Sequence, residues 1–192
     1  MGIFLSFLPW IVFWVLSGRG NYQIAAAASV VAVVFLCIRD IQKRNIKILD
    51  VGTLLFFVFL TLVAYTSEAA WIDNHASPLS SAALFLIALT SILIKKPFTL
   101  RYAREQVDPK FWYTSMFYST NLTISWVWCV AFAITTVTSY MIVLNHFSVI
   151  DRVIYILTFV GAIKFTAWYP DYVKKKVKNE SEAPSPQGGA SR

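Results

Sequence analysis

The sequence is poor in charge and in the side chains that most often carry chemistry. Charged residues make up only 14% of the 192 residues, whereas a soluble domain has about 25%. The two cysteines and two histidines are too few for a fold stapled by several disulfides. They also do not predict a metal site, which needs three or four converging ligands. Because so little charge cannot easily cover a surface that faces water, the composition argues against an ordinary soluble protein.

Long stretches without any charged residue take the place of a charged surface. Hydrophobic residues make up 57% of the chain, and the longest stretch without Asp, Glu, Lys or Arg runs for forty residues, from 111 to 150. A helix needs about 20 apolar residues to cross the hydrocarbon core, where its backbone must satisfy its own hydrogen bonds. The apolar runs are continuous rather than alternating, which favours helices over membrane strands. The sequence therefore predicts an all-α fold, a polytopic bundle of transmembrane helices.

Six candidate spans follow from the charge-free stretches. The first is short and is interrupted by Pro9, and the last contains Lys164, so an arrangement with five spans is the alternative. In that arrangement the first segment lies in the membrane plane on the outer face. Trp10 is near a predicted span end, a depth that tryptophan favours. The six predicted spans are residues 3–16, 22–38, 51–66, 78–94, 117–141 and 153–168.

The basic residues cluster in the connections on one side of these spans. Fifteen of the 17 Lys and Arg residues fall after the second span, after the fourth span, or in and after the last one. Cytoplasmic loops carry an excess of Lys and Arg, so both the N-terminus and the C-terminus of this multi-pass chain are predicted to be cytoplasmic. In this interpretation residues 1–172 form the membrane domain, and residues 173–192 form a tail that is first basic and then disordered.

The connection after the fourth predicted span has the most informative sequence. Pro97 ends the span, and residues 98–106 can form a short interfacial helix before Asp108 and Pro109. The plain interpretation is a basic cytoplasmic loop with a helix at the membrane surface. A sharper hypothesis is a contact site for anionic lipid head groups or a partner protein, because basic residues lie beside aromatic anchors. The candidate residues for this contact are Lys95, Lys96, Arg101, Arg104 and Trp112.

The fifth predicted span is unusually polar. Asn121, Ser125 and Trp128 recur at helical spacing, and side-chain amides and hydroxyls commonly join membrane helices. Helix packing is therefore the first interpretation, and a polar transport path is the second. No acidic residue lies inside a predicted span, which argues against coupling to ions or protons. Lys164 is near enough to its span end to reach the cytoplasmic interface by snorkelling, with a functional charge inside the membrane as the alternative.

Sequence motifs of catalysis and cofactor binding are missing. The chain has no Gly-rich phosphate loop, no nucleophile elbow, no zinc-protease motif and no paired carboxylates. The sequence thus predicts a protein that is not an enzyme, with no catalytic residues, no cofactor site and no metal site. Its basic residues line span ends rather than one folded face, which points to membrane lipid and away from nucleic acid.

Several short pieces, in order along the chain, carry a family resemblance. They are Phe7-Leu8-Pro9-Trp10-Ile11-Val12-Phe13, Lys95-Lys96-Pro97, Trp112 followed by Asn121, Trp126 and Phe132, and Trp168-Tyr169-Pro170. With these pieces the chain resembles the bacterial intracellular septation protein A family of inner-membrane proteins. The resemblance implies a role in envelope maintenance and cell division, through contacts with other membrane proteins. The family supplies no established catalytic residues.

The predicted function is that of a non-enzymatic integral protein of the bacterial inner membrane. In this hypothesis it acts in the lipid bilayer by assembling with envelope or division proteins. The alternative is a small transporter or channel for an unidentified solute, for which a homo-oligomer is one arrangement. Polar residues lining one face of several helices would favour the transporter.

Overall fold

The computed structural model describes residues 2–17, 21–66, 69–144 and 149–182. These residues are almost entirely helical and include no strand, which confirms the predicted all-α fold. The helices are α1 (Gly2–Ser6), α2 (Leu8–Ser17), α3 (Tyr22–Gln42), α4 (Ile48–Thr66), α5 (Ala69–Leu93), α6 (Thr99–Arg104), the 3-10 turn η1 (Pro109–Phe111), α7 (Ser115–Val143) and α8 (Val149–Glu182).

Five of these helices are long and apolar enough to cross a membrane, namely α3, α4, α5, α7 and α8. They coincide with the last five predicted spans. The first predicted span is not one continuous helix, because it breaks at Phe7 into α1 and α2. Pro9 lacks the N–H that would bond the carbonyl four residues earlier, and its ring crowds that carbonyl. The ten residues of α2 rise about 15 Å, half the thickness of the hydrocarbon core.

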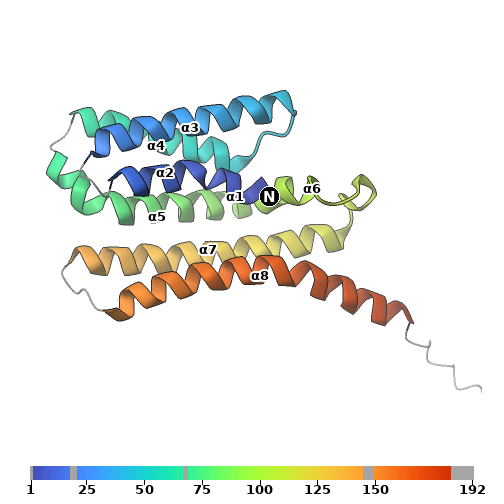
Figure 1. Ribbon diagram of the computed structural model, residues 1–192. Coiled ribbons are helices and arrows are strands. Elements are labelled where there is room, and N and C mark those ends of the chain that lie inside the picture. Colours follow the sequence, from blue (N-terminus) through green and yellow to red (C-terminus); the bar gives the residue numbers. More distant parts are fainter. Residues whose placement is uncertain (1, 18–20, 67–68, 145–148, 183–192) are drawn as a thin grey trace, which may run out of the picture.

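The short helix α2 lies inside the bundle, alongside α3 and α4 (Figure 1). Trp10 is fully buried, and its indole N–H donates a hydrogen bond of 3.1 Å to Thr53 Oγ1 on α4. Phe7, at the break, stacks on Trp128 of α7 with ring centroids 5.5 Å apart. Trp10 is therefore a core side chain rather than a ring exposed on the surface of the bundle. The same packing excludes a first segment lying flat on the outer face.

The long helices run back and forth, so their connections alternate between the two ends of the bundle. Figure 1 shows α6, the α3–α4 connection and the C-terminal half of α8 at the same end as α1. The helix α8 lies along α7 and continues past the bundle (Figure 1). Residues 173–182, which we expected to begin a tail, continue α8 to Glu182, and residues 183–192 lie outside the described part of the chain.

The outward-facing side chains of the long helices are largely apolar. Phe35 on α3 and Leu55 and Leu62 on α4 are 63–68% exposed. Exposed apolar faces on several helices of spanning length fit a lipid environment rather than water. The chain is thus built as a multi-pass membrane protein.

Candidate functional site

The connection between α5 and α7 folds into a compact unit, which we name the α6 platform (residues 95–114). It begins at Lys95, a non-glycine residue with a φ of 57°. The N–H of Lys95 bonds the carbonyl of Ile92, and the N–H of Lys96 bonds the carbonyl of Ser91. This pair of bonds ends α5 in a Schellman motif. The turn delivers Phe98, which is only 1% exposed, into the core as the first anchor of the platform.

Hydroxyl groups fix α6 to its neighbours. Thr99 Oγ1 donates to the carbonyl of Asn121 at 2.9 Å and lies 2.9 Å from Ser125 Oγ. Since Thr99 has one hydroxyl proton, Ser125 is the donor in the second bond. Tyr102 donates a 2.8 Å hydrogen bond to Ser6 Oγ on α1. Burial raises the pKa of Tyr102 well above its usual value, so the phenol keeps the proton that this bond requires.

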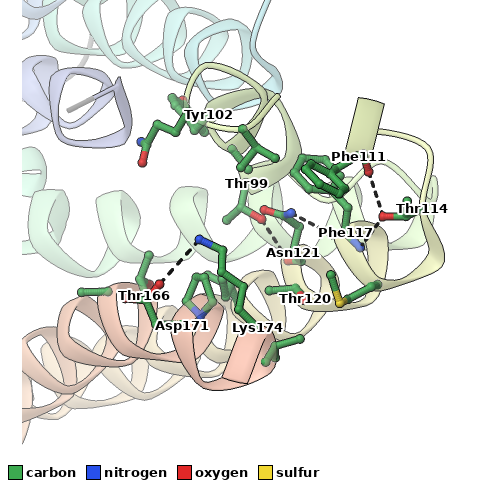
Figure 2. A pocket seen from close by; sticks show the side chains of 18 of the residues that line it. Thr99, Tyr102, Phe111, Thr114, Phe117, Thr120, Asn121, Thr166, Asp171 and Lys174 are labelled. Atoms are coloured by element: carbon green, nitrogen blue, oxygen red, sulfur yellow. Dashed lines mark hydrogen bonds and ion pairs between the residues drawn. The ribbon is translucent and has the colours of Figure 1, made fainter. Parts of the chain in front are cut away.

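The structure thus confirms a short helix within residues 98–106, reduced to the six residues of α6. Asn121 and Ser125, singled out as polar residues of a span, are buried where α7 meets α6. Asn121 Nδ2 also donates 2.8 Å to the carbonyl of Phe117 one turn earlier. The platform is therefore joined to α7 through the backbone carbonyl of Asn121 and the hydroxyl of Ser125, and Figure 2 shows Thr99 next to Asn121.

The five residues expected to contact lipid or a partner divide into two groups. Lys95, Lys96 and Arg101 are exposed. Arg104 is half-buried, and its guanidinium lies 5.4 Å from the centre of the Trp112 ring. The indole N–H of Trp112 donates 2.8 Å to the carbonyl of Val107. Arg104 and Trp112 therefore brace the platform from within, while the three exposed cations are free to meet an anion.

A cavity of about 600 Å³ lies between the α6 platform, α7 and the C-terminal half of α8. Figure 2 shows Phe111, Phe117 and Thr120 on one side of it and Thr166, Asp171 and Lys174 on the α8 side. Asp171 and Lys174 form an ion pair of 3.6 Å on α8. Because the lining is more apolar than polar, an apolar group fits it better than a polar solute does. The apolar residues of the lining include Ile3, Val107, Phe111, Met116, Phe117, Ile124, Ala167 and Val173.

A second group of charged side chains, not anticipated from the sequence, lies between α3, α4 and α6. We name Asp40, Lys47, Asp50 and Glu105 the buried charge cluster. Asp40, Lys47 and Asp50 are each 1% exposed. Lys47 Nζ is 3.2 Å from Asp40 Oδ1 and 3.0 Å from Glu105 Oε1. The ammonium also lies 5.0 Å from the centre of the Tyr102 ring. The cluster reaches water at Glu105, whose side chain is 33% exposed.

Helical periodicity was the signal that could have found the two aspartates. Asp40 continues the buried positions 29, 33 and 36 of α3, and Asp50 begins the buried positions 53, 57, 60 and 64 of α4. The sequence-based spans stopped at residue 38 and restarted at residue 51, which left both carboxylates outside. The premise that no acidic residue lies in a span is therefore wrong, because α3 extends to Gln42 and α4 begins at Ile48.

Lys164 and His75 lie outside these two groups. Lys164 is exposed on α8, one turn before Trp168, a position that suits a snorkelling side chain rather than a charge facing the bundle interior. His75 lies on α5, and His146 lies outside the described residues. In the described part of the chain no three His, Cys, Asp or Glu side chains converge as metal ligands.

Comparisons with family models, curated proteins and solved structures find no significant match to the chain. The resemblance to the septation protein A family therefore stays a prediction from the short sequence pieces.

Proposed function

We propose that the chain is a non-enzymatic inner-membrane protein of a bacterium that holds anionic lipid head groups and neighbouring membrane proteins on the α6 platform. In this proposal it serves envelope maintenance or division by assembly with other proteins of the membrane. The observation that carries the proposal is the rigid attachment of an exposed basic and aromatic surface to the end of the bundle.

The anchors of the platform face inwards and its cations and aromatic rings face outwards. Phe98, Thr99 and Tyr102 are 1–4% exposed. Phe111 is 43% exposed with the Lys110 ammonium 5.0 Å from its ring centre, and Tyr113 is 88% exposed. Aromatic rings favour the head-group region, and each Lys or Arg near an anionic surface adds about 1 kcal/mol of attraction. The platform thus combines both elements of a lipid-contact surface.

The cavity beside the platform extends the same surface towards the bundle. Its apolar lining can accept an acyl chain whose head group stays near Lys174, at the α8 end of the lining. The positive-inside rule places the platform end of the bundle in the cytoplasm. In the proposal both termini lie on that side.

Lipid retention by purified protein tests the contact. The variant carrying Lys96→Gln and Arg101→Gln should retain anionic phospholipid about five- to thirty-fold less well than wild type, since two cations are lost. Native mass spectrometry of protein from mixed anionic and zwitterionic lipid measures the ratio. Lys43→Gln, an exposed cation at the same end outside the platform, is the matched control. Equal retention in all three proteins would refute the lipid contact.

Partner assembly needs a separate experiment. Crosslinking in intact membranes followed by affinity purification should recover envelope or division proteins with the wild type, and fewer with the platform variant. Recovery of none of these proteins counts against the assembly role.

A small transporter is the second candidate function, and the buried charge cluster favours it. Ionisable groups inside a helical membrane bundle are rare and commonly mark ion or proton pathways. Reconstitution into liposomes distinguishes the two functions. Specific and saturable solute flux would support the transporter and would count against the assembly role.

A further inference from the structure

The buried charge cluster has carboxylate oxygens that accept no hydrogen bond. Asp40 Oδ1 accepts from Lys47 at 3.2 Å and from Arg39 at 3.3 Å. Asp40 Oδ2 and both carboxyl oxygens of Asp50 are buried without a hydrogen-bond donor. Lys47 is already shared with Glu105, so its ammonium is divided between two other carboxylates. If all the acids were ionised, Asp50 would be a buried anion with no counter-charge of its own.

Such an anion is strongly disfavoured in a low-dielectric interior, and taking up a proton removes the charge. A protonated Asp50 also becomes a donor, which the free oxygen of Asp40 lacks. Polar or charged neighbours surround Asp50 on several sides. They are Ser6 from α1, Cys37 and Asp40 from α3, Lys47 directly before α4, and Tyr102 and Glu105 from the α6 platform. Among them only Lys47 is a cation, and it is already engaged.

We propose that Asp50, together with Asp40, forms a binding site for one exchangeable proton at the platform end of the bundle. The Lys47 ammonium repels a second cation, so a proton suits the site better than a metal ion. Asp50 carries the proton, and Asp40 accepts the hydrogen bonds of Lys47 and Arg39. The site couples α1, α3, α4 and α6, and loss of the proton weakens the contacts between them.

A small apolar cavity borders this site at the outer surface of the bundle. It measures about 190 Å³, and its lining includes Cys37, Asp40, Lys47 and Asp50. The remaining lining residues are aliphatic, and three of them, Ile41, Ile46 and Val51, are 40–60% exposed. The carboxyl oxygens of Asp50 lie buried behind this lining. The apolar cavity favours a reagent dissolved in detergent or lipid over a charged one.

Dicyclohexylcarbodiimide tests the proposal because it reacts with a protonated carboxyl group. The acid proton goes to one nitrogen of the reagent, a carboxyl oxygen bonds to its carbon, and acyl migration leaves a stable N-acylurea of the same total mass. Peptide mass spectrometry of the full-length protein should locate the adduct on Asp50. The yield should fall at least ten-fold from about pH 5 to about pH 9 as the group deprotonates. Asp50→Asn should abolish this adduct.

Asp108→Asn is the matched control, since the Asp108 side chain is 54% exposed and lies on the platform surface. That variant should label at Asp50 as the wild type does. An Asp50 yield that is absent at low pH or independent of pH overturns the proposal. Suppression by Na⁺ at constant pH also overturns it and assigns the site to a metal cation.

Thermal unfolding gives a second readout. Wild-type protein should lose stability as the pH rises and Asp50 loses its proton, because the native state then contains an unpaired buried anion. Asp50→Asn copies the neutral acid and should have a melting temperature that stays level over the same range. Parallel pH profiles of the two proteins would contradict a protonated Asp50.

Discussion

Lys47 is the only cation fully buried in the charge cluster, and its neighbours depend on it. Its ammonium lies within 3.2 Å of carboxylate oxygens of both Asp40 and Glu105. Removing one partner of a buried pair is costly because the remaining charge is left without compensation. Lys47 is therefore a shared ionic link between α3, the residue before α4 and the α6 platform.

Replacing Lys47 by Met should lower the free energy of unfolding by about 3–5 kcal/mol, since Asp40 loses its buried counter-ion. Denaturant titration of the detergent-solubilised protein measures the loss. Lys43→Met, in the exposed turn after α3, should change stability by less than about 0.5 kcal/mol. Equal stability of the two variants would show that Lys47 is not a structural centre.

Individual residues differ in how far the sequence predicts them. The helical spacing of Asn121, Ser125 and Trp128 correctly indicated one buried face of α7. Lys47 is separated from Glu105 by 58 positions, and no local pattern joins them. A lysine that marks a cytoplasmic loop and a lysine that neutralises buried acids have the same sequence environment, so only the tertiary contact distinguishes them.

Close packing between α4 and α5 depends on one glycine. A Cβ atom at Gly52 would lie 2.7 Å from Ile87 Cγ1 and 3.1 Å from Ile87 Cγ2, whereas a Cβ at Gly161 of α8 meets nothing within 4 Å. Small residues permit this kind of approach between membrane helices.

Gly52→Leu should therefore destabilise the protein by about 1–3 kcal/mol through overpacking. Gly161→Leu should be neutral or stabilising by up to about 1 kcal/mol, because leucine has the higher helix propensity. Thermal melts of both variants in one detergent provide the comparison. The opposite order of the two variants would contradict the packing of α4 on α5.

Four of the five long helices could be predicted because absence of charge over 17 or more residues is a strong signal of a membrane span, whereas the predicted span in α8 contains Lys164. The position of α2 inside the bundle could not be predicted from the sequence. An apolar segment broken by Pro9 suits a half-span, a surface helix or a buried helix equally well. The deciding facts are the contacts of Trp10 with Thr53 and of Phe7 with Trp128, which arise only when the bundle has formed.

The distribution of basic residues distinguishes the two ends of the bundle. The exposed residues Lys43 and Lys110 lie in the two connections at the platform end, and Thr66 ends α4 at the opposite end. In the proposed topology, which follows the positive-inside rule, this end meets the cytoplasm.

Single cysteines placed after removal of Cys37 and Cys129 test this orientation. Thr66→Cys should react with a membrane-impermeant maleimide in intact cells, while Lys43→Cys and Lys110→Cys should react only after permeabilisation. Labelling of the latter two from outside would reverse the proposed topology. Unchanged protein yield in the cysteine-free background is the control.

The turn at Lys95 places a residue with a side chain at a positive φ. A side chain at a positive φ costs about 1–2 kcal/mol, which glycine avoids. Arg44, at the end of α3, has a φ of 51° and shares the conformation. Both helix ends thus carry a cation at a position where the backbone favours glycine. At Lys95 and Arg44 the chain therefore has a positive charge despite the conformational free-energy cost of a positive φ. Replacing either residue by glycine would remove that cost and also one positive charge from this end of the molecule.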